Sequence, residues 1–153
     1  MNRSQLLKRL DVAWNALKAS FAGLSDSKML EPGVTGIWSI KDVIAHVTSW
    51  EEESLTHLPL ILAGGKTPRY SVTYGGIDAF NAQTMKRKRN LSLSKVLLQR
   101  DDTHRRLIDF IQRVPEDQFI RETRFRRRLR LDTYSHYSKH TEAIRKWREQ
   151  HSV

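Results

Sequence analysis

Three histidines have the side-chain type and the spacing of a metal site. His136 and His140 are four residues apart in a segment near the end of the chain that is predicted to be helical. Their imidazoles therefore lie about 40° apart around the helix axis and nearly stack, which places two nitrogens on one side of a metal ion. His46 falls within the apolar stripe of an earlier helical segment. Three inward imidazoles from two helices would form a three-nitrogen site with positions left open for water or substrate.

The same pattern has a plainer interpretation. A chain with six histidines contains some pairs at this spacing by chance, and an inward histidine is more often neutral and hydrogen-bonded to a carbonyl or hydroxyl. His104 shares a stripe with Leu97 and Ile108, so it can replace one ligand or belong to the core. We expect His57 and His151 at the surface or at a helix end. Spacing alone does not choose between a metal site and a polar core.

A carboxylate and a phenol near these histidines are candidate catalytic groups. Glu53 lies two turns beyond His46 on roughly the same face, so it is a candidate base or fourth ligand. Tyr137 is a candidate hydrogen-bond donor to a substrate. Glu51 follows Trp50 and is expected to point outward, and a solvated helix face is the simpler expectation for both glutamates. The chain has no cysteine, which excludes a thiolate site and a cysteine nucleophile.

The elements that must position these residues are helices. Apolar residues recur with gaps of three and four along the first segment, which predicts one buried helix face formed by Leu7, Leu10, Trp14, Leu17, Phe21 and Leu24. A second helix is predicted to begin near Ser39, where Asp42 three residues later resembles a capping box. Pro59 is expected to bend or end it. The glycine- and proline-containing stretch that follows predicts a long connection.

The second half of the chain predicts more helix and no strand. Asp78 is expected to cap a third helical stretch, and Ser92 or Ser94 to begin the next one, which stops near Pro115. Residues 116–131 are expected to form a basic connection. A last helix is predicted from Asp132 or Thr133 to about Gln150. The predicted fold class is all-α, a bundle of four main helices with one long crossover connection.

Positive charge is concentrated in the second half of the chain. The 153 residues carry 27 Lys and Arg against 17 Asp and Glu, a net charge of +10. Residues 1–75 hold 8 basic and 7 acidic residues, a difference of +1, whereas residues 76–153 hold 19 and 10, a difference of +9. Two basic runs contribute most of this, Lys86 to Arg89 and Arg121 to Arg130. Such runs bind polyanions in some proteins and form only a solvated surface in others.

Length and hydropathy indicate the class of protein. A chain of 153 residues suits one domain, residues 1–153. No segment approaches the roughly 18 uninterrupted apolar residues of a membrane span, and the first residues lack the apolar core of a signal peptide. We therefore expect a soluble, cytoplasmic protein without a membrane segment.

Three segments resemble a known family. Residues 36–51 fit the pattern Trp-Ser-x-Lys-Asp-x-x-x-His-x-x-x-Trp-Glu, with His46 at its centre. Residues 78–81 read Asp-Ala-Phe-Asn, and residues 135–147 contain the two spaced histidines followed by Ile-Arg-Lys-Trp. In order and spacing these segments resemble the DinB-like superfamily, and more narrowly its ClbS/DfsB branch. The second and last of the expected long helices carry the specific part of the resemblance.

The resemblance implies a bundle with one long crossover and a function for the histidines. When the family's ligands are transferred to the matching positions, the resemblance implies that His46, His136 and His140 hold one divalent transition metal per chain. The metal would be nickel, zinc, iron or manganese. It also implies a reaction on a small molecule, as a hydrolase or a thiol transferase in stress or toxin protection, and a homodimer.

Two other functions remain open from the sequence. The basic runs allow a nucleic-acid or other polyanion-binding module, although no helix-turn-helix or zinc-finger pattern accompanies them, which makes nucleic acid the less favoured partner. The bundle can also bind and sequester a small toxic molecule without any metal. Substitution of His140 separates the metal-dependent function from the metal-free one.

Overall fold

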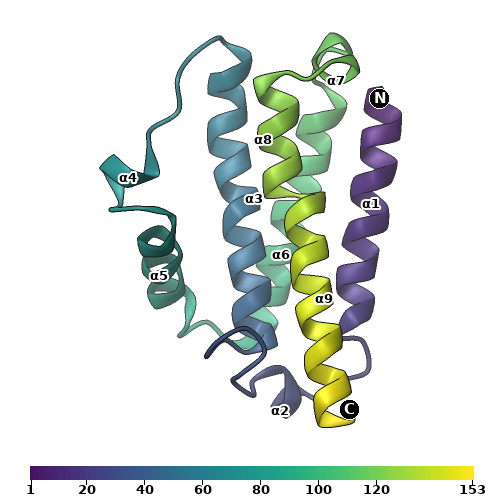
Figure 1. Ribbon diagram of the computed structural model, residues 1–153, viewed down its shortest axis with the longest axis vertical. Coiled ribbons are helices and arrows are strands. Elements are labelled where there is room, and N and C mark those ends of the chain that lie inside the picture. Colours follow the sequence, from purple (N-terminus) through teal and green to yellow (C-terminus); the bar gives the residue numbers. More distant parts are fainter.

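The computed structural model describes residues 1–153 and consists of helices joined by short and long connections, without any strand (Figure 1). The all-α fold class is therefore confirmed. The helical segments are α1 Arg3–Ser20, α2 Asp26–Met29, α3 Ile40–Leu62, α4 Tyr70–Thr73, α5 Ile77–Lys88, α6 Leu93–Gln112, α7 Asp117–Ile120, α8 Arg124–Asp132 and α9 Tyr134–His151.

Helix α1 forms from the predicted apolar stripe. The Asn2 side chain accepts from the Gln5 N–H, and the Gln5 side chain accepts from the Asn2 N–H. This capping box satisfies backbone N–H groups that have no partner within the helix. The helix ends at Ser20, earlier than the stripe suggests, and the chain turns at Gly23, where φ is 80°. The buried residues of the helix are Leu6, Leu10, Trp14, Leu17 and Ser20.

Helix α3 begins at the predicted cap and carries one of the three histidines. The Ser39 hydroxyl accepts from the Asp42 N–H, and the Asp42 carboxylate accepts from the Ser39 N–H. The helix does not end at Pro59 but continues to Leu62. One further turn is possible because Pro59 removes only its own N–H, while its carbonyl still accepts from Ala63.

The long crossover leaves the end of α3 and contains α4 and α5. Figure 1 shows both lying outside the bundle, on the side of α3. Helix α5 is fixed to α3 by two polar contacts: Trp50 Nε1 donates to Asn81 Oδ1 at 2.9 Å, and Lys88 Nζ lies 2.9 Å from Glu52 Oε1. The long crossover predicted from the sequence is confirmed.

The region from 77 to 113 forms two helices. The first, α5, has Gly76 at its N-cap, so the expectation that Asp78 caps it is wrong. Asp78 lies instead in the first turn, where its negative charge interacts favourably with the helix dipole. Ser92 caps the second helix, α6, by accepting from the N–H of Lys95.

The predicted basic connection at 116–131 is largely helical, which corrects the sequence interpretation. Helix α8 starts after Thr123, whose hydroxyl caps it, and Phe125 and Leu129 are fully buried one turn apart. These two apolar residues are enough to anchor a short amphipathic helix whose other residues are mostly arginines. The chain breaks helical geometry at Thr133, where ψ is −105°, and α9 continues from there.

The long helices pack into one bundle around a shared core. Figure 1 shows α1 and the consecutive helices α8 and α9 running opposite to α3 and α6. Helix α3 packs against both α6 and α8, and α1 packs against α9. The core extends from Leu6 in α1 to Trp147 in α9. No helix is long and apolar enough to span a membrane.

Candidate metal centre

Three imidazoles from two helices meet inside the bundle. His46 projects from α3, and His136 and His140 project from α9 one turn apart. The Nε2 atom of His136 lies 2.9 Å from that of His46 and 3.0 Å from that of His140. One ligand atom from each of the three residues lies within 4.8 Å of the others, and His46 and His140 are buried.

Hydrogen bonds alone do not satisfy these three nitrogens. A neutral imidazole carries one N–H, and each contact between two Nε2 atoms needs one donor and one acceptor. The Nε2 atom of His136 takes part in both contacts. It would have to accept two N–H groups on one lone pair or direct one N–H at two acceptors. Three lone pairs directed at a single cation avoid this conflict.

The distances between these nitrogens also fit a metal. Two imidazole nitrogens bound to one ion at about 2.0–2.1 Å are roughly 3 Å apart or slightly more, close to the separations found here. The Nδ1 atoms of His136 and His140 are buried without a hydrogen-bond partner in the protein. These are the atoms that carry the ring proton when Nε2 is a ligand.

All three imidazoles are held neutral. Burial lowers the pKa of His46 to about 3, and the nearby His140 lowers it further. Burial is also the main cause for His136, whose pKa falls to about 2, and for His140, whose pKa falls to about 4. Metal ligation requires the neutral ring, so the site is in the correct protonation state at neutral pH.

A cleft of about 400 Å³ opens beside the histidines. His46 and His136 form part of its wall. The other wall residues come from α3, the crossover, α5, α8 and α9, and include Trp50, Tyr70, Ile77, Asn81, Arg128, Leu131, Asp132 and Lys139. A volume of this size accommodates a small organic molecule.

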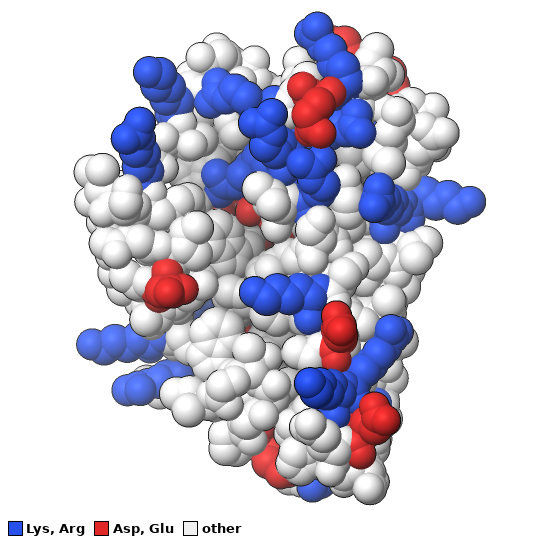
Figure 2. Space-filling view, viewed as in Figure 1, with Lys and Arg blue, Asp and Glu red and all other residues white.

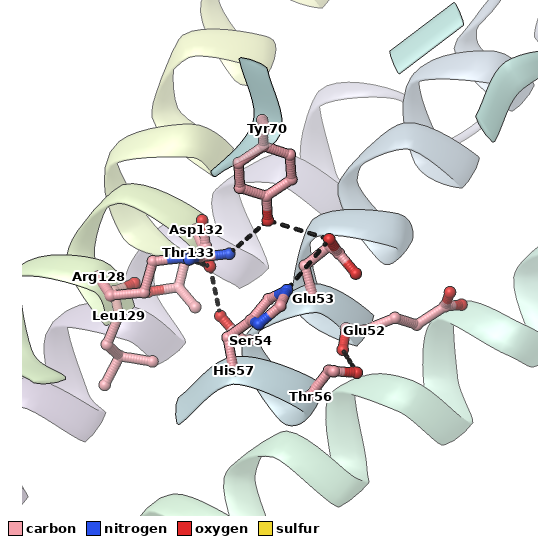
Figure 3. A network of polar contacts seen from close by, with 10 residues as sticks. All are labelled: Glu52, Glu53, Ser54, Thr56, His57, Tyr70, Arg128, Leu129, Asp132 and Thr133. Atoms are coloured by element: carbon pink, nitrogen blue, oxygen red, sulfur yellow. Dashed lines mark hydrogen bonds and ion pairs between the residues drawn. The ribbon is translucent and has the colours of Figure 1, made fainter. Parts of the chain in front are cut away.

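A polar network lies along one side of the cleft (Figure 3). Arg128 Nε donates to Asp132 Oδ2 at 2.6 Å, and Arg128 Nη2 donates to the Tyr70 hydroxyl at 2.7 Å. The Tyr70 hydroxyl in turn donates to Glu53 Oε1 at 2.9 Å, and Ser54 Oγ donates to Asp132 Oδ2 at 2.7 Å. The network therefore joins the crossover to α3 and α8.

Burial and neighbouring charges together set the protonation states of the network. Burial raises the pKa of the Tyr70 phenol well above its usual value, so the hydroxyl keeps its proton. Burial opposes the charge on Arg128, but the adjacent Asp132 outweighs it and raises the pKa of the guanidinium. Arg128 is therefore a permanent cation with a fixed orientation at the cleft.

Glu53 and His57 form the end of this network away from Asp132. Glu53 does not line the cleft itself but contacts Tyr70, which does. His57 Nε2 lies 3.4 Å from Glu53 Oε1. The side chain of His57 is buried, so its expected surface position is wrong. The i,i+4 spacing on α3 brings it against Glu53 rather than toward solvent.

Glu51 points into the bundle, contrary to the outward orientation expected from the sequence. Its side chain is fully buried, and its Oε2 accepts from Tyr137 and lies 2.7 Å from His104 Nδ1. The His104 ring stacks on Trp14, with 3.7 Å between the centroids. His104 is thus committed to Glu51 and is not part of the three-histidine cluster. Tyr137 is also fully buried and does not line the cleft.

Sequence reasoning missed Tyr70, Arg128 and Asp132. Arg128 and Asp132 are spaced i,i+4 with opposite charges, a signal that a helical interpretation of residues 116–131 would have used. Tyr70 lies in the crossover, where no periodicity indicates which side chain returns to the bundle. Its place in the site depends on the path of the connection.

The two basic runs separate into structural and exposed residues. Lys88 is buried against Glu52, and Arg126, Arg128 and Arg130 make hydrogen bonds within the protein. The exposed cations of the two runs are Lys86, Arg87, Arg89, Arg121, Arg124 and Arg127. The runs lie toward opposite ends of α3: Lys41 contacts the Arg89 carbonyl, and Arg124 contacts the Gly65 carbonyl.

Comparison with known proteins supports this architecture. A model of the DinB superfamily matches residues 9–142. Among solved structures, the chain is similar to DfsB, described as a sibling lethal factor precursor, with a TM-score of 0.82 and 18% identity over 99% of this chain and 97% of that one. It is also similar to the colibactin self-resistance protein ClbS in complex with double-stranded DNA, with a TM-score of 0.78 and 16% identity over 95% and 94% of the two chains.

A third similar structure is an uncharacterised protein from Escherichia coli UTI89. Its TM-score is 0.82 and its identity 13%, over 99% of this chain and 95% of that one. At these identities the likenesses establish the fold. No curated protein sequence is significantly similar to the chain.

Proposed function

The chain belongs to the DinB superfamily, and on that premise we propose that it holds one divalent transition-metal ion on three histidines and acts on a small molecule in the adjoining cleft. The ligands are His46, His136 and His140. The observation that supports this most directly is the meeting of three neutral Nε2 atoms beside the cleft, which His46 and His136 help to line.

The donor set defines the kind of ion. Imidazole suits zinc, nickel and iron, so these ions are favoured over manganese, which prefers oxygen ligands as magnesium and calcium do. Three neutral ligands leave the full charge of the ion in place. When bound, such an ion acts as a Lewis acid toward an oxygen of the substrate or of water.

The protein residues around the cleft have separate roles in this proposal. Glu53 is the proton acceptor, reached through Tyr70: the Tyr70 hydroxyl passes its proton to Glu53 Oε1 as it takes one from the attacking water or thiol. Because the proton moves through the hydroxyl in one step, no free phenolate is required. Tyr137 acts from a distance by holding α9 against Glu51 of α3, which keeps the ligands on the two helices in register.

The reaction class is hydrolysis or thiol transfer that protects the cell from a reactive small molecule. ClbS is described as a self-resistance protein, and this chain has its fold. A protective hydrolase needs an activated oxygen, an acceptor for its proton and a cleft for the toxin. Glu53 and the cleft supply the second and third of these, and an ion held by His46, His136 and His140 would supply the first.

Elemental analysis tests the proposal. We expect about one equivalent of a transition metal in protein purified without a histidine tag, and loss of that metal in the His46→Ala and His140→Ala variants. The His151→Ala variant is the matched control, because His151 is exposed at the end of α9. Absence of metal after reconstitution would contradict the proposal and favour a bundle that sequesters a small molecule without metal.

Binding to double-stranded DNA is a second candidate function. The observation that favours it is that ClbS was crystallised with double-stranded DNA, together with the exposed arginines near the start of α8. Fluorescence anisotropy of a labelled duplex would measure it. We expect Arg124→Gln and Arg127→Gln to weaken binding and flatten its salt dependence by about one unit of slope each. Arg105→Gln, on α6, is the control. Absence of binding by the unaltered protein would exclude this function, and equal binding by all variants would place the duplex away from Arg124 and Arg127.

The proposal also treats residues 1–153 as one domain, supported by a core that extends from the first helix to the last, and places the protein in the cytoplasm. A homodimer would use a surface outside this core. The apolar face of α1 is buried within the chain and is not free to form such an interface.

A further inference from the structure

We infer that the cleft beside the three histidines selects small molecules that carry an anionic group, a carboxylate or a phosphate, on a flat apolar body. The inference rests on the proposed function only in treating this cleft as the substrate site. It follows from three properties of the cleft: its unbalanced charge, the fixed position of one cation and the nature of its apolar wall.

The side chains that line the cleft have a net positive charge. Arg128 and Lys139 are cations, and Asp132 is the one acid among the lining residues. Asp132 already accepts hydrogen bonds from Arg128 and Ser54. Lys139 is exposed and has no hydrogen bond or ion pair with the protein. One positive charge therefore remains for a ligand, before any metal is counted.

Lys139 is placed next to the proposed reaction centre. It lies on α9 between His136 and His140 and lines the same cleft as His136. Its charge is close enough to contribute to the lowered pKa of all three histidines. An ammonium group at this place can bind the anionic end of a molecule whose reacting part faces the histidines.

Arg128 offers a second donor whose orientation is already set. Its Nε atom is used by Asp132 and its Nη2 atom by the Tyr70 hydroxyl, whereas its Nη1 atom makes no hydrogen bond with the protein. The guanidinium is mostly buried, with 15% of its side chain exposed. A cation held in this way loses little conformational freedom when an anion binds, so it favours carboxylates and phosphates over neutral groups.

The rest of the cleft is apolar and aromatic. The rings of Trp50 and Tyr70 lie 5.3 Å apart and are tilted by 41°. Ile77 and Leu131 line the same cleft and are 54% and 58% exposed, although both are apolar. A flat hydrocarbon or aromatic body would cover them and lie against the rings. Figure 2 shows this hollowed face, with basic side chains gathered over α8 beside it.

Three probes with the same naphthalene body test the inference: 2-naphthoate, 2-naphthyl phosphate and the neutral 2-naphthamide, which matches the naphthoate in shape. Titration calorimetry is carried out on the full chain, both metal-loaded and stripped with a chelator. We expect at least one anion to bind at least tenfold more tightly than the amide in both forms. The preferred anion identifies the headgroup as a carboxylate or a phosphate.

Variants assign the selectivity to the proposed cations. Lys139→Gln should reduce anion affinity about tenfold and leave the amide unchanged, and Lys139→Arg should restore it. Lys146→Gln removes the same charge from an exposed position of α9 and should behave as the wild type. Arg128→Lys keeps the positive charge beside Asp132 but loses the oriented N–H donors of the guanidinium. It should weaken anion binding without unfolding the protein.

The outcomes separate this inference from the metal proposal. Selective, Lys139-dependent anion binding by a chain that takes up no metal would support the inference and contradict the proposed function. Uptake of metal by a chain that binds the amide as tightly as both anions would support the proposed function and contradict the inference. Anion selectivity that disappears in the stripped protein would overturn the inference, because the ion alone would then account for it.

Discussion

Tyr137 donates its phenol hydrogen to Glu51 across the contact between α9 and α3, and neither side chain is exposed. His104 approaches the same carboxylate oxygen from α6. A glutamate buried without such partners would be strongly destabilising. The three residues therefore tie together three helices of the bundle, two of which carry the proposed metal ligands.

The first prediction concerns this contact. Tyr137→Phe should lower the free energy of unfolding by about 1–3 kcal/mol, because the buried carboxylate loses one of its two donors. Chemical denaturation measures the change. Tyr74→Phe is the control, since the Tyr74 hydroxyl makes no hydrogen bond in the protein and its removal should cost little. If the two variants were equally stable, Tyr137 would not hold α9 to α3.

The second prediction concerns stability in acid. In the metal-free protein, the pKa values of His46, His136 and His140 are lowered to about 3, 2 and 4, whereas the unfolded chain binds protons near pH 6.5. Below pH 6.5 the unfolded state therefore binds more protons. The free energy of unfolding should fall from pH 6.5 toward pH 4, by up to about 1.4 kcal/mol per pH unit for each such histidine.

Urea denaturation at a series of pH values measures this slope. His136→Gln should make it shallower by removing one of the three groups, whereas His151→Gln should leave it unchanged, because His151 is exposed. An identical slope in both variants would show that the cluster is not the source of the acid sensitivity.

The third prediction concerns stabilisation by metal. An ion that binds the folded state alone raises the free energy of unfolding by about 2.7 kcal/mol at a free concentration one hundred times its dissociation constant. Thermal denaturation with and without zinc or nickel should show a higher Tm with the ion. The increase should be absent in His140→Ala, and an equal increase in that variant would place the binding elsewhere.

The fourth prediction concerns the buried pair beside the cleft. Arg128→Leu should destabilise the protein by about 3 kcal/mol or more, because it leaves Asp132 buried without its cation. The double variant Arg128→Leu/Asp132→Leu should recover much of that loss, which a double-mutant cycle measures.

The exposed pair of Arg105 and Asp102 provides the matched comparison. Its side chains are 70% and 53% exposed, so Arg105→Leu should change the free energy of unfolding by less than about 1 kcal/mol. A loss in Arg128→Leu as small as this would mean that Asp132 does not depend on its partner.

Local sequence patterns predicted much of the fold. The stripe of α1 and the caps at Ser39 and Ser92 depend on neighbours within one or two turns, so they can be recognised without knowing the rest of the chain. Sequence patterns failed to predict a helix where the segment contains too few apolar residues to show a periodicity. In α8, Phe125 and Leu129 are the only buried apolar residues, and the arginines around them resemble a connection.

The sequence by itself determined that His136 and His140 share a helix face, because helical spacing is a local property. It also indicated that His46 faces inward. Only the tertiary structure decided that the three nitrogens meet, that Glu51 is buried and that Tyr70 returns from the crossover to Arg128. These relations depend on the rotation of each helix against its neighbours and on the path of a connection without periodicity. Both are set by packing of the whole core, which no short stretch of sequence encodes.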